Sequence, residues 1–155
     1  MTANTAKFTT AMAARAFMTA GNSTVTMVST KTGTRFTYKI RASEAGDVFF
    51  VSLLSGPDNN ADYSYLGRID QQARFWAGRK VPKPGDVGPD APSSTAFRWA
   101  WERLCRGVML DSLEIWHEGR CGRCNRKLTV PSSIASGIGP ECAAKEGFNA
   151  SWVGI

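Results

Sequence analysis

Cysteine and histidine residues near the C-terminal end of the sequence have the types and the spacing of metal ligands. His117, Cys121, Cys124 and Cys142 follow the pattern H-x3-C-x2-C-x17-C. Two cysteines separated by two residues can both face one ion from a tight turn, and Gly122 relieves crowding where the backbone curls around the metal. Closed structural zinc sites include the set of three cysteines and one histidine, so the pattern predicts one structural Zn²⁺.

The third cysteine strengthens this prediction because of its place in the chain. Cys142 follows Gly139 and Pro140, where a short helix over 142–146 is expected to begin. A helix N-terminus stabilises the thiolate form that zinc requires. Cys105 is the rival of His117 for the fourth position, although a free cysteine is also a common small core residue.

A redox pair formed by Cys121 and Cys124 is the alternative to a metal site. Such a pair predicts that the first cysteine opens a helix, whereas the residues that follow, 125–131, resemble the return strand of a hairpin. A catalytic zinc centre would need an open position and a general base, and Glu118 is a single carboxylate beside the site. We therefore expect the zinc to be structural.

The same segment resembles a family of unknown function found in bacteriophages and prophages. The resemblance rests on WHEGRCGRC at 116–124, KLT at 127–129 and GIGPEC at 137–142. It extends to segments 32–38 and 55–59, and so covers roughly residues 20–145. It implies a mobile-element origin, a metal site at the matching histidine and cysteine positions, and no established biochemical activity.

The rest of the sequence predicts an α+β fold around an antiparallel sheet of about four strands. A helix is expected over 6–18, where Phe8, Met12 and Ala16 share a face and Gly21 follows as a stop. The strands follow as a meander, because short apolar or alternating runs are separated by Gly, Pro and Asn. The expected strands are 24–29, 36–40, 48–54 and 63–69.

A second helix is expected over 93–106, with Ser93 or Ser94 as its cap and Gly107 at its end. Its apolar residues fall at helical spacing and would cover the sheet. They are Phe97, Ala100, Trp101 and Leu104. The predicted division is an α+β core over 1–107 and a zinc-binding module, of the zinc-knuckle or treble-clef type, over 108–155.

Length, composition and charge limit the class of protein. The 155 residues with 43% hydrophobic content are enough for a folded core. The excess of 19 Lys and Arg over 13 Asp and Glu, a net charge of +6, favours polyanionic partners. The sequence shows no stretch typical of a membrane span or signal peptide, so we expect a cytoplasmic protein of a bacterial host cell without a membrane partner.

These features predict a non-enzymatic, zinc-stabilised phage or mobile-element protein that binds nucleic acid or a nucleic-acid-handling complex. Cations expected to contact phosphates surround the cysteines and occupy the Pro- and Gly-rich connector before the second helix. They are Arg120, Arg123, Arg126, Lys127, Arg79, Lys80 and Lys83. Aromatic residues on the predicted strands would either stack on unpaired bases or belong to the core. These are Tyr38, Phe49, Tyr63 and Tyr65.

The alternative function is that of an anti-defence inhibitor, similar in role to an anti-CRISPR protein, which binds a host effector or nucleoprotein complex. We expect no enzymatic activity, because the sequence has no Gly-rich phosphate-binding loop and its single histidine is assigned to the metal. The oligomeric state is left open by the sequence.

Overall fold

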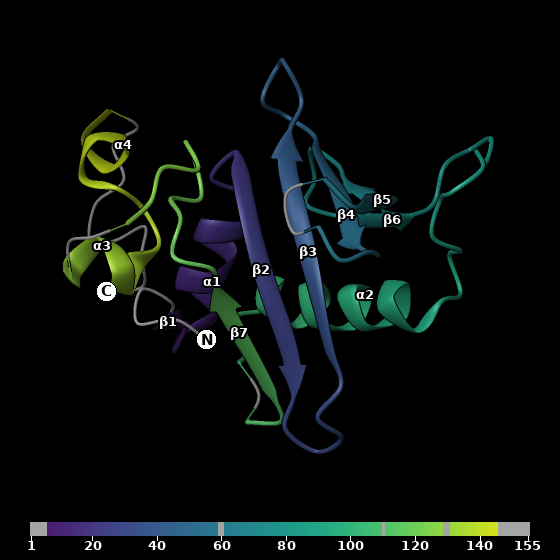
Figure 1. Ribbon diagram of the computed structural model, residues 1–155, viewed down its shortest axis with the longest axis horizontal. Helices are drawn as coiled ribbons and strands as arrows, with labels where there is room; N and C mark the ends of the chain where they lie inside the picture. The colour runs from purple at the N-terminus through teal and green to yellow at the C-terminus, as the bar shows by residue number, and fades with distance from the viewer. Residues whose placement is uncertain (1–5, 59–60, 110, 129–130, 146–155) are drawn as a thin grey trace.

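A computed structural model describes residues 6–58, 61–109, 111–128 and 131–145. In these residues the chain forms one antiparallel sheet of seven strands, in the order β1-β7-β2-β3-β4-β5-β6, and four helices (Figure 1). The strands are β1 (Ala6–Lys7), β2 (Asn22–Ser29), β3 (Arg35–Ala42), β4 (Phe49–Leu54), β5 (Tyr63–Ile69), β6 (Phe75–Ala77) and β7 (Leu113–His117). The helices are α1 (Ala11–Met18), α2 (Pro92–Cys105), α3 (Pro131–Ser136) and α4 (Pro140–Lys145).

The sheet has seven strands and not the predicted four, because short segments extend both edges of the meander β2 to β5. β1 and β6 have only two and three residues, too few to show a hydrophobic period. β7 pairs with β2 on one side and β1 on the other, with Met27 opposite Ile115. Part of the predicted zinc module, residues 113–117, is therefore a strand of the core sheet.

The first helix begins later than the predicted residue 6. Thr10 is its N-cap, and Phe8 lies in the extended segment before it. The buried face of α1 therefore includes Phe17 and Met18, whereas Met12, which was predicted on that face, is 47% exposed. The predicted apolar face of Phe8, Met12 and Ala16 is therefore only partly present, because Phe8 precedes the helix and Met12 is exposed while Ala16 is buried.

The second helix carries its apolar stripe as predicted but begins differently. Its N-cap is Ala91, followed by Pro92, and both Ser93 and Ser94 are buried in the first turn. The indole Nε1 of Trp101 donates a hydrogen bond to a backbone carbonyl in the turn between β5 and β6, at 2.7 Å. The four residues of the stripe are fully buried against the sheet: Phe97, Ala100, Trp101 and Leu104.

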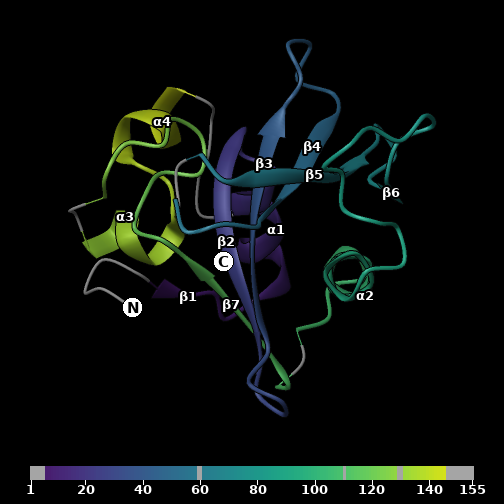
Figure 2. The same cartoon turned by 45° about the vertical axis from the view of Figure 1, so that its right-hand side comes forward.

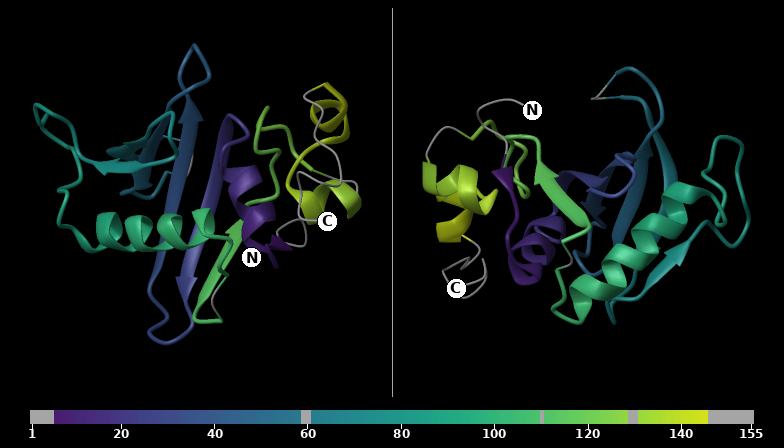
Figure 3. Two further views of the ribbon diagram at one scale, coloured as in Figure 1. Left: turned by 180° about the vertical axis from the view of Figure 1, so that it is seen from behind. Right: turned by 90° about the horizontal axis from the view of Figure 1, so that it is seen from below.

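The sheet has one face covered by α1 and α2, while its other face carries no helix in the described part of the chain (Figures 2 and 3). Tyr38 belongs to the covered face: it is fully buried, and its hydroxyl donates a 2.8 Å hydrogen bond to the carbonyl of Ser93. Tyr38 is therefore a core residue and not a surface for bases. Among the described residues, no helix combines the length and apolar character needed to cross a membrane.

Candidate metal centre

The loop after β7 and helix α4 bring three of the predicted ligands together. The Sγ atoms of Cys121, Cys124 and Cys142 lie within 4.8 Å of one another. Two sulfurs bound to one tetrahedral zinc at about 2.3 Å are about 3.8 Å apart, so small movements of the side chains suffice for coordination. Cys121 and Cys142 are buried and Cys124 is exposed. The cluster could hold a metal ion.

A tight turn presents the first two cysteines. The N–H of Asn125 donates to the carbonyl of Cys121 at 2.9 Å, and the N–H of Cys121 donates to the carbonyl of Arg126 at 2.8 Å. Asn125 has a left-handed backbone with φ of 64°, which asparagine tolerates better than most residues. The chain thus reverses directly after Cys124, as the two-residue spacing requires.

The predicted return strand over 125–131 is only partly present. Arg120 and Lys127 form an isolated antiparallel bridge across the turn. Residues 129–130 lie outside the described residues, and α3 begins at Pro131. The turn is therefore closed by a single bridge.

Gly122 is needed for packing beneath the turn, which differs from its predicted role beside the metal. A Cβ atom at this position would lie 2.8 Å from ring carbons of Phe17 and 3.0 Å from the Phe17 carbonyl oxygen. The Gly122 N–H donates to the carbonyl of Gly137 at 2.9 Å, and its carbonyl accepts from the N–H of Asn22 at 2.7 Å. The cysteine turn is therefore joined directly to α1, β2 and the segment before α4.

Hydrogen bonds prepare Cys121 for ionisation. Burial of its thiol raises the pKa, but backbone N–H groups outweigh this and lower it, among them those of Gly139 at 3.3 Å and Arg123 at 3.4 Å from Sγ. Burial raises the pKa of Cys142 to about 11, and the neighbouring Cys124 and Cys121 add to this effect. Cys121 therefore ionises at lower pH than Cys142, whose pKa stays raised although the side chain of Arg123 lowers it.

The predicted fourth ligand, His117, lies outside the cluster. It is fully buried beside the rings of Phe8 and Phe17, each with a centroid separation of 5.6 Å. Its Nδ1 accepts a hydrogen bond from the N–H of Gly119 at 3.0 Å, so the ring proton is assigned to Nε2, which donates to the carbonyl of Ile134. Burial lowers the pKa of His117, which favours this neutral form. In this arrangement the lone pair of Nδ1, the one ring nitrogen without a proton, already accepts the hydrogen bond from Gly119.

The rival fourth ligand, Cys105, also lies elsewhere. It is at the end of α2, with its Sγ 3.9 Å from the carbonyl of Ala73, and burial raises its pKa. It packs against the core as a half-buried side chain, as the alternative interpretation of a free cysteine predicts. The described residues thus supply three thiols to the candidate site.

Several of the predicted cations surround the cysteines and interact with the site itself. A pocket of about 250 Å³ opens over the sulfurs, with Arg123, Arg126 and Lys127 in its wall. The guanidinium of Arg123 approaches the Sγ of Cys142 at 3.8 Å, and that of Arg126 pairs with exposed Glu141 at 3.2 Å. Lys127 is exposed.

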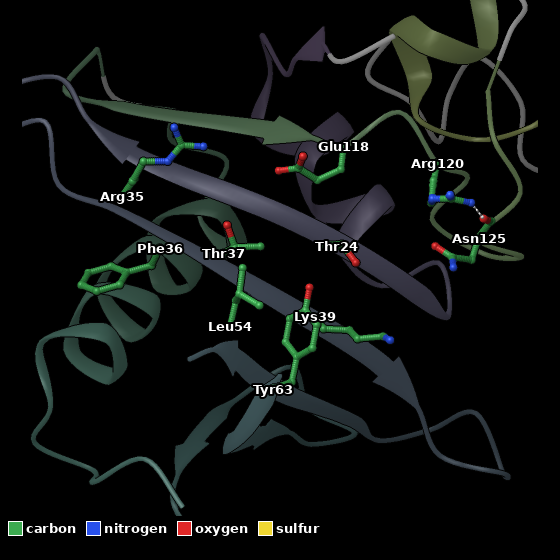
Figure 4. Close-up of a pocket in the computed structure, with 10 residues that line it drawn as sticks. All are labelled: Thr24, Arg35, Phe36, Thr37, Lys39, Leu54, Tyr63, Glu118, Arg120 and Asn125. Atoms are coloured by element: carbon green, nitrogen blue, oxygen red, sulfur yellow. Dashed lines mark hydrogen bonds between the residues drawn. The ribbon is translucent and has the colours of Figure 1, made fainter. Parts of the chain in front are cut away.

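A larger pocket, of about 510 Å³, lies on the open face of the sheet beside the cysteine turn (Figure 4). Arg120 reaches its edge from the turn, and Arg35 and Lys39 come from β3. The ammonium of Lys39 lies 5.3 Å from the ring centroid of Tyr63, and Glu118 supplies the one carboxylate of the wall. We call this set of wall residues the sheet pocket, and its balance of three cations to one carboxylate makes it attractive to anions.

Sequence reasoning named Arg120 and Tyr63 but missed Arg35 and Lys39. The signal was present, because residues at every second position of a strand share a face and β3 has Arg35, Lys39 and Arg41 in this period. Which face they share depends on Tyr38 and Ile40, whose burial under α2 places the cations on the open side.

The predicted cations of the connector lie away from the cysteines. The guanidinium of Arg79 pairs with Asp86 at 2.8 Å and lies 4.0 Å from the ring centroid of Tyr65. Lys80 and Lys83 are exposed on the connector. Phe49 is half-buried and packs against the core on the covered face.

Comparison with known proteins places the cysteine cluster in a recognised family segment. The model of a family of unknown function, DUF6011, matches residues 115–147. The match includes His117 and the three clustered cysteines, whereas the upstream segments 32–38 and 55–59 lie outside it. The predicted resemblance is thus confirmed as far as a family of unknown function, and the phage origin stays a prediction. No curated protein and no solved structure matches the chain.

Proposed function

We propose that the cysteine cluster binds one structural Zn²⁺ and that the surface beside it binds nucleic acid without catalysis. Support for zinc comes from the donor set: three thiols within 4.8 Å, two of them buried, with N–H donors aimed at one sulfur. Soft thiolate ligands select zinc over hard cations such as Mg²⁺ and Ca²⁺. The ion would fix the turn that carries Arg120 relative to α4.

The proposed protein ligands are Cys121, Cys124 and Cys142, with His117 as a positioning residue. Its bond to the carbonyl of Ile134 holds α3 against the core. For His117 to coordinate zinc, it would have to exchange one of its two backbone hydrogen bonds for the metal.

Native mass spectrometry tests this ligand set. The wild type should carry one zinc, Cys142→Ala should carry none, and His117→Gln should keep its zinc, because glutamine retains a donor and an acceptor. A wild-type protein purified with zinc in the medium that carries no metal would refute the zinc site. A folded His117→Gln variant that has lost its zinc would instead make His117 a ligand.

The observation that carries the nucleic-acid proposal is the sheet pocket. The turn of the metal site contributes Arg120 to the wall of this pocket, and strand β3 contributes Arg35 and Lys39, with Tyr63 beside Lys39 (Figure 4). Phosphate contacts from arginine and lysine give most of the affinity of non-specific nucleic-acid binding. An aromatic ring beside such cations can stack on a base.

Fluorescence anisotropy with labelled DNA and RNA at low salt tests this proposal. Wild type should bind, and its affinity should fall steeply with added salt. Arg120→Gln and Lys39→Gln should each reduce the dependence of log affinity on log salt by about 0.7–0.9. Arg106→Gln is the matched control, since Arg106 is exposed at the end of α2. Equal effects of all three variants would contradict a specific role for the pocket. The inhibitor hypothesis stays a prediction.

A further inference from the structure

A row of alternating arginine and aromatic residues crosses the open face of the sheet beyond the sheet pocket. In the strand register, Arg41 of β3 is opposite Phe50 of β4, Phe50 is opposite Arg68 of β5, and Arg68 is opposite Trp76 of β6. Directly opposed residues share a face and have Cβ atoms about 5 Å apart. We call these four residues the arginine–aromatic row.

The row lies on the face away from the helices. Its neighbours along the strands, Ile40 and Val51, are fully buried on the covered face, and side chains alternate between faces. Phe50 is 42% exposed and Trp76 is 46% exposed. The two exposed rings lie on the same face of the sheet, with Arg68 between them.

The ring of Trp76 is held in a fixed position. Its Nε1 donates a 2.8 Å hydrogen bond to Asp70, and the guanidinium groups of Arg68 and Arg74 lie 5.8 and 5.6 Å from its ring centroid. The carboxylate of Asp70 also accepts from the Nε of Arg74 at 3.0 Å. An exposed tryptophan with these contacts loses little side-chain entropy when a planar group stacks on it.

We propose that the arginine–aromatic row binds the bases and phosphates of a single-stranded nucleic acid. This inference rests on the proposed function and extends it to a second surface and to one class of nucleic acid. Base–aromatic stacking tolerates any sequence, and the neighbouring arginines meet the backbone charge. The row itself holds two arginines, Arg41 and Arg68, and no carboxylate, while Arg74 beside it is paired with Asp70. The charge of the row therefore complements a polyanion.

Geometry favours a single strand over a duplex. Phe50 and Trp76 stand two strands apart, and adjacent strands are about 4.8 Å apart, so the two rings are separated by about 10 Å. A ring can stack only on a base whose flat face is free, and in a duplex both faces of each base are covered by neighbouring bases. Bases that stack on the two rings must therefore leave the stack, which an unpaired strand allows at low cost.

The test compares labelled oligothymidine and oligouridine of about 12 nucleotides with a blunt DNA duplex of the same length. Wild type should bind the single strands more tightly than the duplex. Phe50→Ala and Trp76→Ala should each weaken single-strand binding by about 5- to 150-fold, and Trp76→Phe should restore most of the lost affinity.

Trp99→Ala is the matched control. Trp99 is 36% exposed on α2, and the guanidinium of Arg103 lies 4.1 Å from its ring centroid. Like Trp76 it is an exposed tryptophan beside an arginine, but it lies on the helical side of the sheet. This variant should bind as wild type does. Circular dichroism melting of each variant establishes that it is folded at the temperature of the assay.

The outcomes separate the inference from the proposed function. If duplex binds as tightly as single strands, and Phe50→Ala and Trp76→Ala bind as wild type while Arg120→Gln is weakened, the arginine–aromatic row is refuted and the sheet pocket stands. If wild type binds no nucleic acid at low salt, both proposals fall. A Trp99→Ala variant as weak as Trp76→Ala would also overturn the assignment to this face.

Discussion

Replacing Gly122 with alanine tests whether the cysteine turn depends on its packing against α1. The added Cβ would lie 2.8 Å from ring carbons of Phe17 and 3.0 Å from its backbone carbonyl oxygen. The ring has little room to move away, because Phe17 is 1% exposed and packs against Phe8 and His117. The turn or the helix must shift instead.

The expected cost follows from these contacts. An extra methyl group in a packed core destabilises a protein by about 1–3 kcal/mol. Alanine also has less conformational freedom than glycine in the unfolded chain, which raises the unfolding free energy by about 0.4–1 kcal/mol. The net loss of unfolding free energy for Gly122→Ala therefore lies between about 0 and 2.6 kcal/mol, with a central value of about 1.3 kcal/mol. That central value lowers the melting temperature of a chain of this length by about 3–5 °C.

Gly88→Ala is the matched control for this change. A Cβ atom at Gly88 meets no atom within 4 Å in the described part of the chain, apart from its chain neighbours, and its φ is not left-handed. Scanning calorimetry of the zinc-loaded proteins should show Gly88→Ala melting at or slightly above wild type. If Gly122→Ala melts no lower than Gly88→Ala, the close packing of the turn against Phe17 is wrong.

Three further outcomes are expected. Free zinc at about 100 times its Kd should stabilise wild type by about 2.7 kcal/mol, so a chelator should lower its melting temperature by about 5–10 °C and leave Cys142→Ala unchanged. Burial raises the pKa of Tyr38, so the unfolded chain ionises first and the unfolding free energy falls above about pH 10. At neutral pH, Tyr38→Phe should lower the unfolding free energy by about 1–3 kcal/mol, because the carbonyl of Ser93 loses its hydrogen-bond donor. Denaturant titrations at increasing pH should then show a smaller decrease of unfolding free energy above about pH 10 for this variant than for wild type. The hydrogen bonds from the indole of Trp76 and the backbone N–H of Arg74 lower the pKa of Asp70 to about 2. The hydrogen bond between Trp76 and Asp70 should therefore persist below the ordinary carboxyl pKa and be lost as the pH falls through about 2. The indole N–H resonance of Trp76 should shift with that midpoint, and Asp70→Asn should abolish the shift.

Local patterns in the sequence were enough to locate the central strands, the second helix and the cysteines. β2 to β5 and the buried stripe of α2 follow from periods of two and about 3.6 residues, which act over a few neighbouring positions. The spacing of Cys121, Cys124 and Cys142 predicted their convergence, because two of them share one turn. The short edge strands β1 and β6 could not be predicted, since their extended form depends on pairing with β7 and β5.

The hydrogen bonding of His117 depends on the tertiary structure. Sequence spacing brings its backbone near the cysteine turn, but packing beside Phe8 and Phe17 directs both ring nitrogens to backbone groups. The role of Gly122 changed for the same reason, because Phe17 approaches it from a helix about a hundred residues earlier in the chain.

The sequence by itself determined the types of metal-donor atoms, the positive net charge and the alternation of side chains between the two faces of each strand. Only the tertiary structure decided which side of each strand faces solvent, because a shift of one residue in register would exchange the two faces. Burial of Tyr38, Ile40 and Val51 under the helices leaves the opposite positions open. Strand register then aligns Arg41, Phe50, Arg68 and Trp76, which lie far apart in the chain, in one row.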